Sequence, residues 1–173
     1  MNIHLAYVNQ PLPAYRERLM GDLKARLPYA ISDGLLTLDL KPFFNAQRNQ
    51  YYSTKILLQL IANRPEGAGK ILGLVAPDLY IPVLTFLFGE AQLNGPGAVV
   101  STFRLHNAFY GLREDPALLY DRLLKECLHE LGHTLGLVHC EDFRCVMYAS
   151  TYIEESDIKA ADFCGRCREG LAG

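Results

Sequence analysis

Three histidines between residues 129 and 139 constrain the fold of this chain more than any other feature. The stretch reads HELGHTLGLVH, so two histidines stand four residues apart and a third follows a glycine. Residues four apart on a helix lie one turn from each other on the same face, and the rings of His129 and His133 can therefore reach one metal ion. Ten residues of continuous helix would carry His139 roughly 15 Å away. Gly136 accepts a positive φ and predicts the turn that brings His139 back.

The side chains of this stretch predict a catalytic zinc site. Three neutral imidazoles fill three of the four tetrahedral positions around zinc and leave one for water, which distinguishes a catalytic site from a structural one. Glu130 lies about 100° around the helix from His129. There it can take a proton from the water as a general base without binding the metal. The alternative is an exposed helix face with two incidental histidines, which leaves Glu130, Gly136 and His139 unexplained.

The helix that carries this motif has clear sequence signals. Asp115 is a favourable N-cap, and Pro116 is favourable at the first helical position. Apolar residues then recur at three- and four-residue steps and predict one apolar face. They are Leu119, Leu123, Leu124, Cys127, Leu128, Leu131 and Leu135. A separate polar stripe holds Arg122, Glu126, His129 and His133.

The cysteines form a second group that could bind a metal ion. Cys140, Cys145, Cys164 and Cys167 pair as C-x4-C and C-x2-C, with eighteen residues between the pairs. This spacing is close to that of structural zinc sites, in which four thiolates close the coordination shell. Two disulfides are the competing interpretation, and a redox C-x-x-C at the second pair is another. Cys127 falls on the apolar face of the helix and is interpreted as a core residue.

The combined pattern resembles the archaemetzincin family of zinc metallopeptidases. The resemblance rests on the histidine motif, on the C-x4-C-x-M pattern that directly follows it, and on the distant C-x-x-C pair. Residues 86–105 show a looser similarity. The resemblance implies a catalytic zinc on His129, His133 and His139, with Glu130 as the base. It implies a structural zinc on Cys140, Cys145, Cys164 and Cys167. Met147 would form the methionine turn beneath the histidines.

The resemblance also implies the fold. We expect an α/β (α+β), metzincin-like single domain over residues 1–173, with a twisted mixed sheet, an antiparallel edge strand, a backing helix and the helix of the H-E-x-x-H motif. Residues 1–136 would hold the sheet and helices, and residues 137–173 a short, zinc-stapled C-terminal part with little regular pattern. Residue periodicity predicts strands at 2–8, 35–40, 70–76, 83–93 and 97–105 and helices at 13–26 and 50–64. By resemblance, strand 83–93 would pair with an extended peptide.

Composition and charge limit the classes of partner and the cellular compartment that we expect. The chain has 173 residues and a net charge of −2, so no basic footprint indicates nucleic acid. The apolar residues 71–89 are interrupted by Pro77, Asp78 and Pro82 and predict strands rather than a membrane span. The N-terminus lacks the basic and apolar regions of a signal peptide. We therefore expect a cytoplasmic protein with reduced cysteines, with a monomer as the default state.

The sequence predicts hydrolysis of peptide bonds, with a peptide or protein as substrate. Water on the zinc would lose a proton to Glu130 and attack the carbonyl. Tyr148 and Tyr152 are candidate donors to the oxyanion. One alternative is a catalytically silent module that binds zinc or peptides, although a pure binding site has no need of Glu130. Another is a small adaptor that needs only the cysteine-bound zinc.

Overall fold

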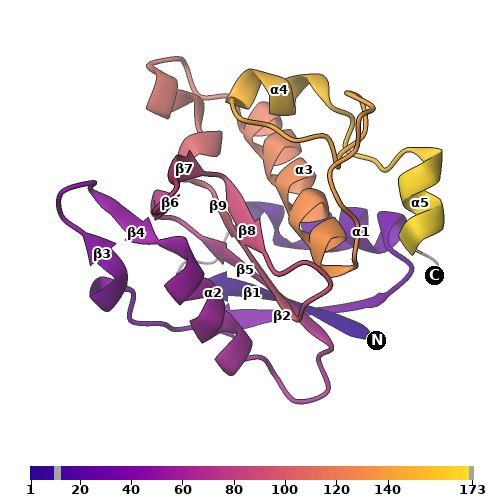
Figure 1. The fold of residues 1–173 in the computed structure, drawn as a ribbon, viewed down its shortest axis with the longest axis horizontal. Coiled ribbons are helices and arrows are strands. Elements are labelled where there is room, and N and C mark those ends of the chain that lie inside the picture. The colour runs from indigo at the N-terminus through magenta and orange to yellow at the C-terminus, as the bar shows by residue number, and fades with distance from the viewer. Residues whose placement is uncertain (10–12, 172–173) are drawn as a thin grey trace.

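The central sheet has five strands, in the order β2-β1-β5-β9-β8 (Figure 1). The structure is a computed structural model that describes residues 1–9 and 13–171. The strands are β1 Asn2–Val8, β2 Ala30–Leu36, β5 Lys70–Val75, β8 Gly89–Ala91 and β9 Gly97–Ser101. The first four in this order pair in parallel, whereas β8 pairs with β9 in the antiparallel direction. The predicted mixed sheet with an antiparallel edge strand is therefore confirmed.

Helices cover both faces of this sheet. Successive side chains of a strand point to opposite faces, and the inner strands are apolar on both, as strands between two helical layers are. One face packs against α1 Pro13–Arg26 and α3 Pro116–Thr134, and the other against α2 Ser53–Ala62. Along β1, for example, Leu5 belongs to the first of these cores and Ala6 to the second.

A smaller sheet lies beside the first, in the order β3-β4-β6-β7. Its strands are β3 Phe44–Asn45, β4 Gln50–Tyr52, β6 Leu79–Ile81 and β7 Leu84–Leu87. Short 3-10 helices connect the elements: η1 Lys41–Phe43, η2 Phe103–Leu105 and η3 Asn107–Tyr110. Because β7 leads directly into β8, the small sheet is joined to the edge strand of the large one.

Two predicted elements were misplaced near the N-terminus. The strand predicted at 35–40 is β2, which begins at Ala30, because seven residues pair in register with β1. Leu38 and Leu40, which suggested the later strand, instead pack against the core beside α2. The helix predicted over 50–64 begins only at Ser53, because the preceding residues pair as β4.

Two predicted strands were too long. Residues 83–93 are not one strand: the chain bends at Phe88 and divides into β7 and β8, which belong to different sheets. The strand predicted at 97–105 ends at Ser101, where η2 follows. The Ser101 hydroxyl donates a hydrogen bond to the Pro77 carbonyl and accepts one from the Phe103 amide, which accounts for the turn.

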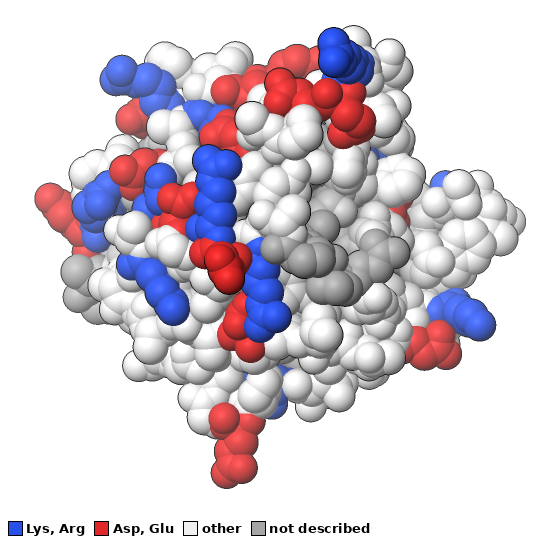
Figure 2. All heavy atoms as spheres, turned by 180° about the vertical axis from the view of Figure 1, so that it is seen from behind, with Lys and Arg blue, Asp and Glu red and all other residues white. Residues whose placement is uncertain are grey.

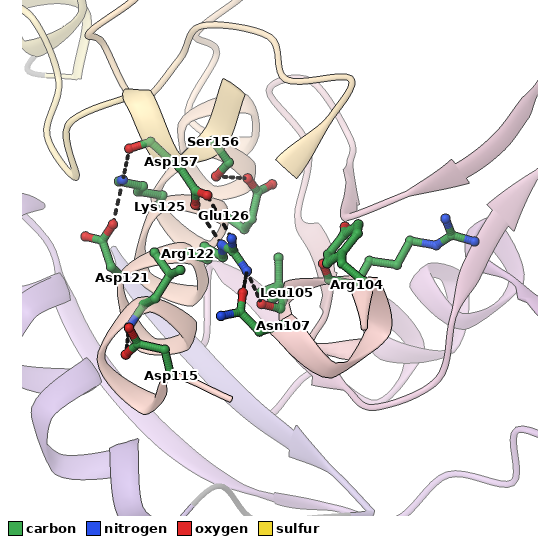
Figure 3. Close-up of polar contacts among 12 residues, drawn as sticks. Arg104, Leu105, Asn107, Asp115, Asp121, Arg122, Lys125, Glu126, Ser156 and Asp157 are labelled. Carbon is green, nitrogen blue, oxygen red and sulfur yellow. Dashed lines mark hydrogen bonds and ion pairs between the residues drawn. The ribbon is translucent and has the colours of Figure 1, made fainter. Parts of the chain in front are cut away.

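The polar stripe of α3 is buried rather than exposed. Arg122, Glu126 and His129 are each less than a tenth exposed. Figure 3 shows Arg122 and Glu126 reaching residues of α4 Ile153–Ile158, which lies across α3. The Arg122 guanidinium pairs with both oxygens of Asp157 at 2.7 Å and donates to the Leu105 carbonyl, and Ser156 donates to Glu126 at 3.1 Å. This network docks the C-terminal part on the helix of the histidine motif.

The C-terminal part is more regular than predicted. Besides α4 it contains α5 Gly165–Leu171, which begins directly after Cys164 and carries Cys167 on its buried side. The boundary at residues 136 and 137 stays a prediction.

Charges of both signs are interspersed on the face turned away in Figure 1, as Figure 2 shows. The ion pairs of α1 include Arg16 with Asp33 of β2 at 2.5 Å and Arg26 with Asp22 at 2.8 Å. Within the parts of the chain that the structure describes, no helix has the length and apolar character needed to cross a bilayer.

Candidate metal centres and active site

The chain turns back after α3 at the glycine that the sequence singled out. Gly136 has φ +94°, its amide donates to the His133 carbonyl at 3.0 Å, and the Leu137 amide donates to the Gly132 carbonyl at 2.9 Å. These bonds satisfy carbonyls at the end of the helix, as in a Schellman motif. The turn brings the His139 ring centroid to 5.3 Å from that of His129 and 4.9 Å from that of His133.

We expect Gly136→Ala to disrupt this turn. A residue with a Cβ is strained at this positive φ, so the unfolding free energy should fall by about 1–2 kcal/mol. Because His139 depends on the turn, zinc bound per chain should fall at limiting zinc. Thermal unfolding and metal analysis measure the two effects. Gly21→Ala is the control, since Gly21 lies within α1 and an added Cβ there meets nothing within 4 Å. An unchanged melting temperature in Gly136→Ala would contradict the prediction.

The ring nitrogens of the two helical histidines fit a metal ion between them. His129 Nδ1 lies 2.8 Å from the Val146 carbonyl and His133 Nδ1 2.8 Å from the Leu137 carbonyl. A carbonyl only accepts, so each Nδ1 carries the hydrogen and each Nε2 presents a lone pair. These Nε2 atoms are 3.1 Å apart. At this distance the two lone pairs repel each other unless a cation lies between them. Two bonds of a tetrahedral zinc ion would place the nitrogen atoms about 3.3 Å apart.

Burial keeps these histidines in the form that binds metal. It lowers the pKa of His129 to about 3, with a smaller effect of the Lys159 charge in the same direction. The pKa values of His133 and His139 are lowered for the same leading reason. The imidazoles are therefore neutral at physiological pH, as a ligand must be.

Glu130 is buried beside the histidines against the edge strand. A Cβ built on Gly89 of β8 would lie 2.7 Å from Glu130 Cγ and Oε1, so the glycine makes room for the carboxylate. Burial raises the pKa of Glu130 well above its usual range, the nearby Glu126 and Glu90 raise it further, and Lys159 opposes them. A carboxylate with a raised proton affinity is suited to accept a proton and to pass it on. No motif or spacing in the sequence singled out Gly89.

Met147 forms a floor beneath the histidine helix. It is fully buried, and a Cβ on Gly132 would lie 2.3 Å from its sulfur, so helix and methionine are in tight contact. The carbonyls on either side of Met147, those of Val146 and Tyr148, accept hydrogen bonds from the buried Lys159 ammonium at 3.3 and 3.0 Å. Lys159 thus holds the segment whose Val146 carbonyl also orients His129. Nothing in the sequence around Lys159 indicated burial.

The four predicted cysteines converge on a second point. Their sulfur atoms lie within 4.8 Å of one another, and those of Cys140 and Cys164 are 3.8 Å apart. Four sulfurs around one zinc at about 2.3 Å would stand about 3.8 Å from each other. All five cysteines are free thiols, so the disulfide interpretation is wrong, and Cys127 is a core residue as expected. The Cys140 amide donates to the Met147 carbonyl at 3.0 Å and connects the two groups of ligands.

Comparison with known proteins identifies the family of the chain. The model of peptidase family M54 matches residues 40–172. The chain belongs to peptidase family M54. The predicted archaemetzincin resemblance is thereby confirmed, and the chain is a zinc-dependent metallopeptidase.

Individual relatives align with nearly the whole length of this chain. An archaemetzincin of Methanocaldococcus jannaschii is 37% identical over 165 residues, which is 94% of this chain and 90% of that protein. The crystal structure of an archaemetzincin from Methanopyrus kandleri has a TM-score of 0.86 at 35% identity, covering 99% of this chain and 93% of that one. A zinc-dependent peptidase from Methanocorpusculum labreanum has a TM-score of 0.87 at 34% identity, covering 98% and 99%. The metzincin-like fold is confirmed.

The histidines of the M54 chain line a cleft of about 650 Å³ between β7, β8, α3 and the segment after Met147. Of the two tyrosines considered for the oxyanion, Tyr152 lines this cleft and Tyr148 does not. Tyr152 is 63% exposed, and its role stays a prediction.

Proposed function

We propose that His129, His133 and His139 hold the catalytic zinc of this peptidase and that Glu130 is its general base. The observation that carries the proposal is the pair of Nε2 lone pairs 3.1 Å apart, each fixed by a carbonyl behind its ring. Cys140, Cys145, Cys164 and Cys167 would hold a second, structural zinc. The 3.8 Å sulfur–sulfur separation supports this assignment, since a closed set of four thiolates leaves no position for water.

Different residues of the chain would have different roles in peptide hydrolysis. Zinc, when bound, lowers the pKa of water toward about 7 and polarises a carbonyl. Glu130 would take the proton of the attacking water and give it to the leaving amine. Val146 and Leu137 keep the histidine rings oriented through their carbonyls. Met147 and Phe88 are among the buried apolar residues that exclude bulk water from the site.

The substrate is a peptide or protein, as for peptidases in general. We propose that an extended peptide pairs with β8, which lines the cleft and, among the residues that the structure describes, is hydrogen-bonded to β9 alone. The free thiols support a reducing compartment, and we propose the cytoplasm. For the oligomeric state, we keep a monomer as the default proposal.

Metal removal tests the assignment of the site. We expect the purified protein to generate new peptide termini from a peptide library, detected by mass spectrometry. Chelation of the histidine-bound zinc should abolish this cleavage, and one equivalent of zinc should restore it. Circular dichroism before and after chelation separates loss of catalysis from unfolding. Cleavage that persists in protein shown by metal analysis to lack zinc would refute the proposed function.

A further inference from the structure

A second cavity adjoins the active-site cleft along β7. It measures about 470 Å³ and shares Leu84 and Thr85 with the cleft. Two arginines, Arg48 and Arg104, line it, and no carboxylate does so among the described residues. We call it the arginine cavity. The cleft differs in its lining, because its walls include Glu90, Glu126 and Glu130, with Lys159 as the one cation among the described residues that line it. The two cavities therefore meet at β7, with carboxylates on the cleft side and two guanidinium groups on the other.

Arg104 is held rigidly with part of its guanidinium unused. Its Nε and Nη2 each donate to Asp78 at 2.7 Å, and the guanidinium lies 4.0 Å from the Phe86 ring and 4.5 Å from the Phe109 ring. Figure 3 shows this side chain extending away from the polar network of α3. Within residues 1–9 and 13–171, Nη1 has no hydrogen-bond partner, so its two hydrogens can meet a ligand.

Arg48 is held against β6 and β7. One Nη1 hydrogen goes to the Leu84 carbonyl at 3.0 Å, and the guanidinium lies 4.5 Å from the centre of the Tyr80 ring. No carboxylate of the described chain pairs with it, so its charge is uncompensated locally. A stacked guanidinium loses little freedom on binding, which favours capture of an anion.

We propose that the arginine cavity binds a carboxylate of the peptide substrate, several residues beyond the scissile bond. This inference rests on the proposed function. A guanidinium fork matches the two oxygens of a carboxylate, and charge-assisted bonds of this kind are the stronger hydrogen bonds in proteins. The exposed Val83 and Leu84 beside the arginines would contact the apolar part of the residue that carries the carboxylate.

The separation of the two sites along the chain limits how far from the cleaved bond the carboxylate can lie. Gly89, which contacts Glu130, stands four positions after Thr85 in the wall of the cavity, and four steps of extended chain span at most about 13 Å. A bound peptide would thus place its carboxylate within about four residues of the cleaved bond. If this is the C-terminal carboxylate, the peptide runs from β8 toward β7, antiparallel to β8.

Paired substrates test the inference and separate the two sources of a carboxylate. Library peptides are made with a free C-terminal carboxylate or a C-terminal amide, and in a second set with Asp or Asn at each position after the cleaved bond. We expect the zinc-loaded protein to prefer the carboxylate member of at least one set about tenfold in kcat/KM. Arg48→Gln should reduce that ratio to about one. Arg18→Gln removes an equal charge from α1, outside both cavities, and should keep it.

A ratio near one for the wild type in both sets would overturn the inference, as would an unchanged ratio in Arg48→Gln. Failure of the proposed function is distinguishable. Binding of the same peptides to the zinc-loaded Glu130→Gln variant needs no turnover, and the ratio of Kd values then decides. A tenfold lower Kd for the carboxylate peptide supports the carboxylate site in the arginine cavity even if no peptide is cleaved. Equal Kd values refute that site.

Discussion

Glu130→Gln should lower kcat/KM for peptide cleavage by about 10²–10⁴-fold, the range typical of a lost general base. Glutamine has nearly the same shape, so it fits the space beside Gly89 that the carboxylate now fills. It cannot accept a proton at neutral pH. The histidines stay in place, so the variant should bind two zinc ions per chain and unfold at about the wild-type temperature. Kinetics, metal analysis and thermal unfolding on one preparation give the three values.

Glu126→Gln is the matched control for this variant. Glu126 lies one turn earlier on α3, is equally buried, lines the same cleft and also has a pKa raised by burial. An amide there can still accept the hydrogen bond of Ser156. We expect Glu126→Gln to retain most of the activity. If both variants cleave peptides at the wild-type rate, the chain does not use Glu130 as its base, and the silent zinc- or peptide-binding module becomes the better description.

The local part of the site was predictable because it lies within eleven consecutive residues. Helical periodicity fixes the relation of His129 to His133, and one glycine with positive φ fixes that of His139. The cysteine spacing similarly predicted a cluster that the structure brings together. These features depend on local geometry and on ligand chemistry, both of which a sequence expresses directly.

The surroundings of the site depend on contacts that no local pattern encodes. Gly89 meets Glu130 only because β8 lies at the edge of the sheet above α3, and Lys159 reaches the carbonyls beside Met147 from another loop. The break at Phe88 was missed because residues 83–93 read as one continuous apolar run. The arginine cavity exists because that break sends β7 into the second sheet, where Arg48 and Arg104 flank it.

Cys167→Ala should remove one zinc ion per chain and lower the melting temperature by about 10 °C or more. Structural zinc contributes much of the folding free energy of small metal-bound units, and a change of 1 kcal/mol shifts a chain of this size by about 2–4 °C. Cys167 is buried on α5, and the other three ligands come from loops. Loss of one thiolate therefore leaves α5 and the loop after Cys140 without their common anchor.

The same substitution should also weaken the catalytic zinc site, although Cys167 does not belong to it. Cys140 follows His139 directly, and its amide is bonded to the Met147 carbonyl, so loosening the cysteine cluster loosens both His139 and the floor beneath the histidines. Cys127→Ala is the matched control: it truncates an equally buried cysteine of the core and should keep both zinc ions. Metal analysis, thermal unfolding and peptide cleavage of the two variants check this. Equal zinc content in both variants would mean that the four thiols hold no metal, and that packing alone fixes the C-terminal part.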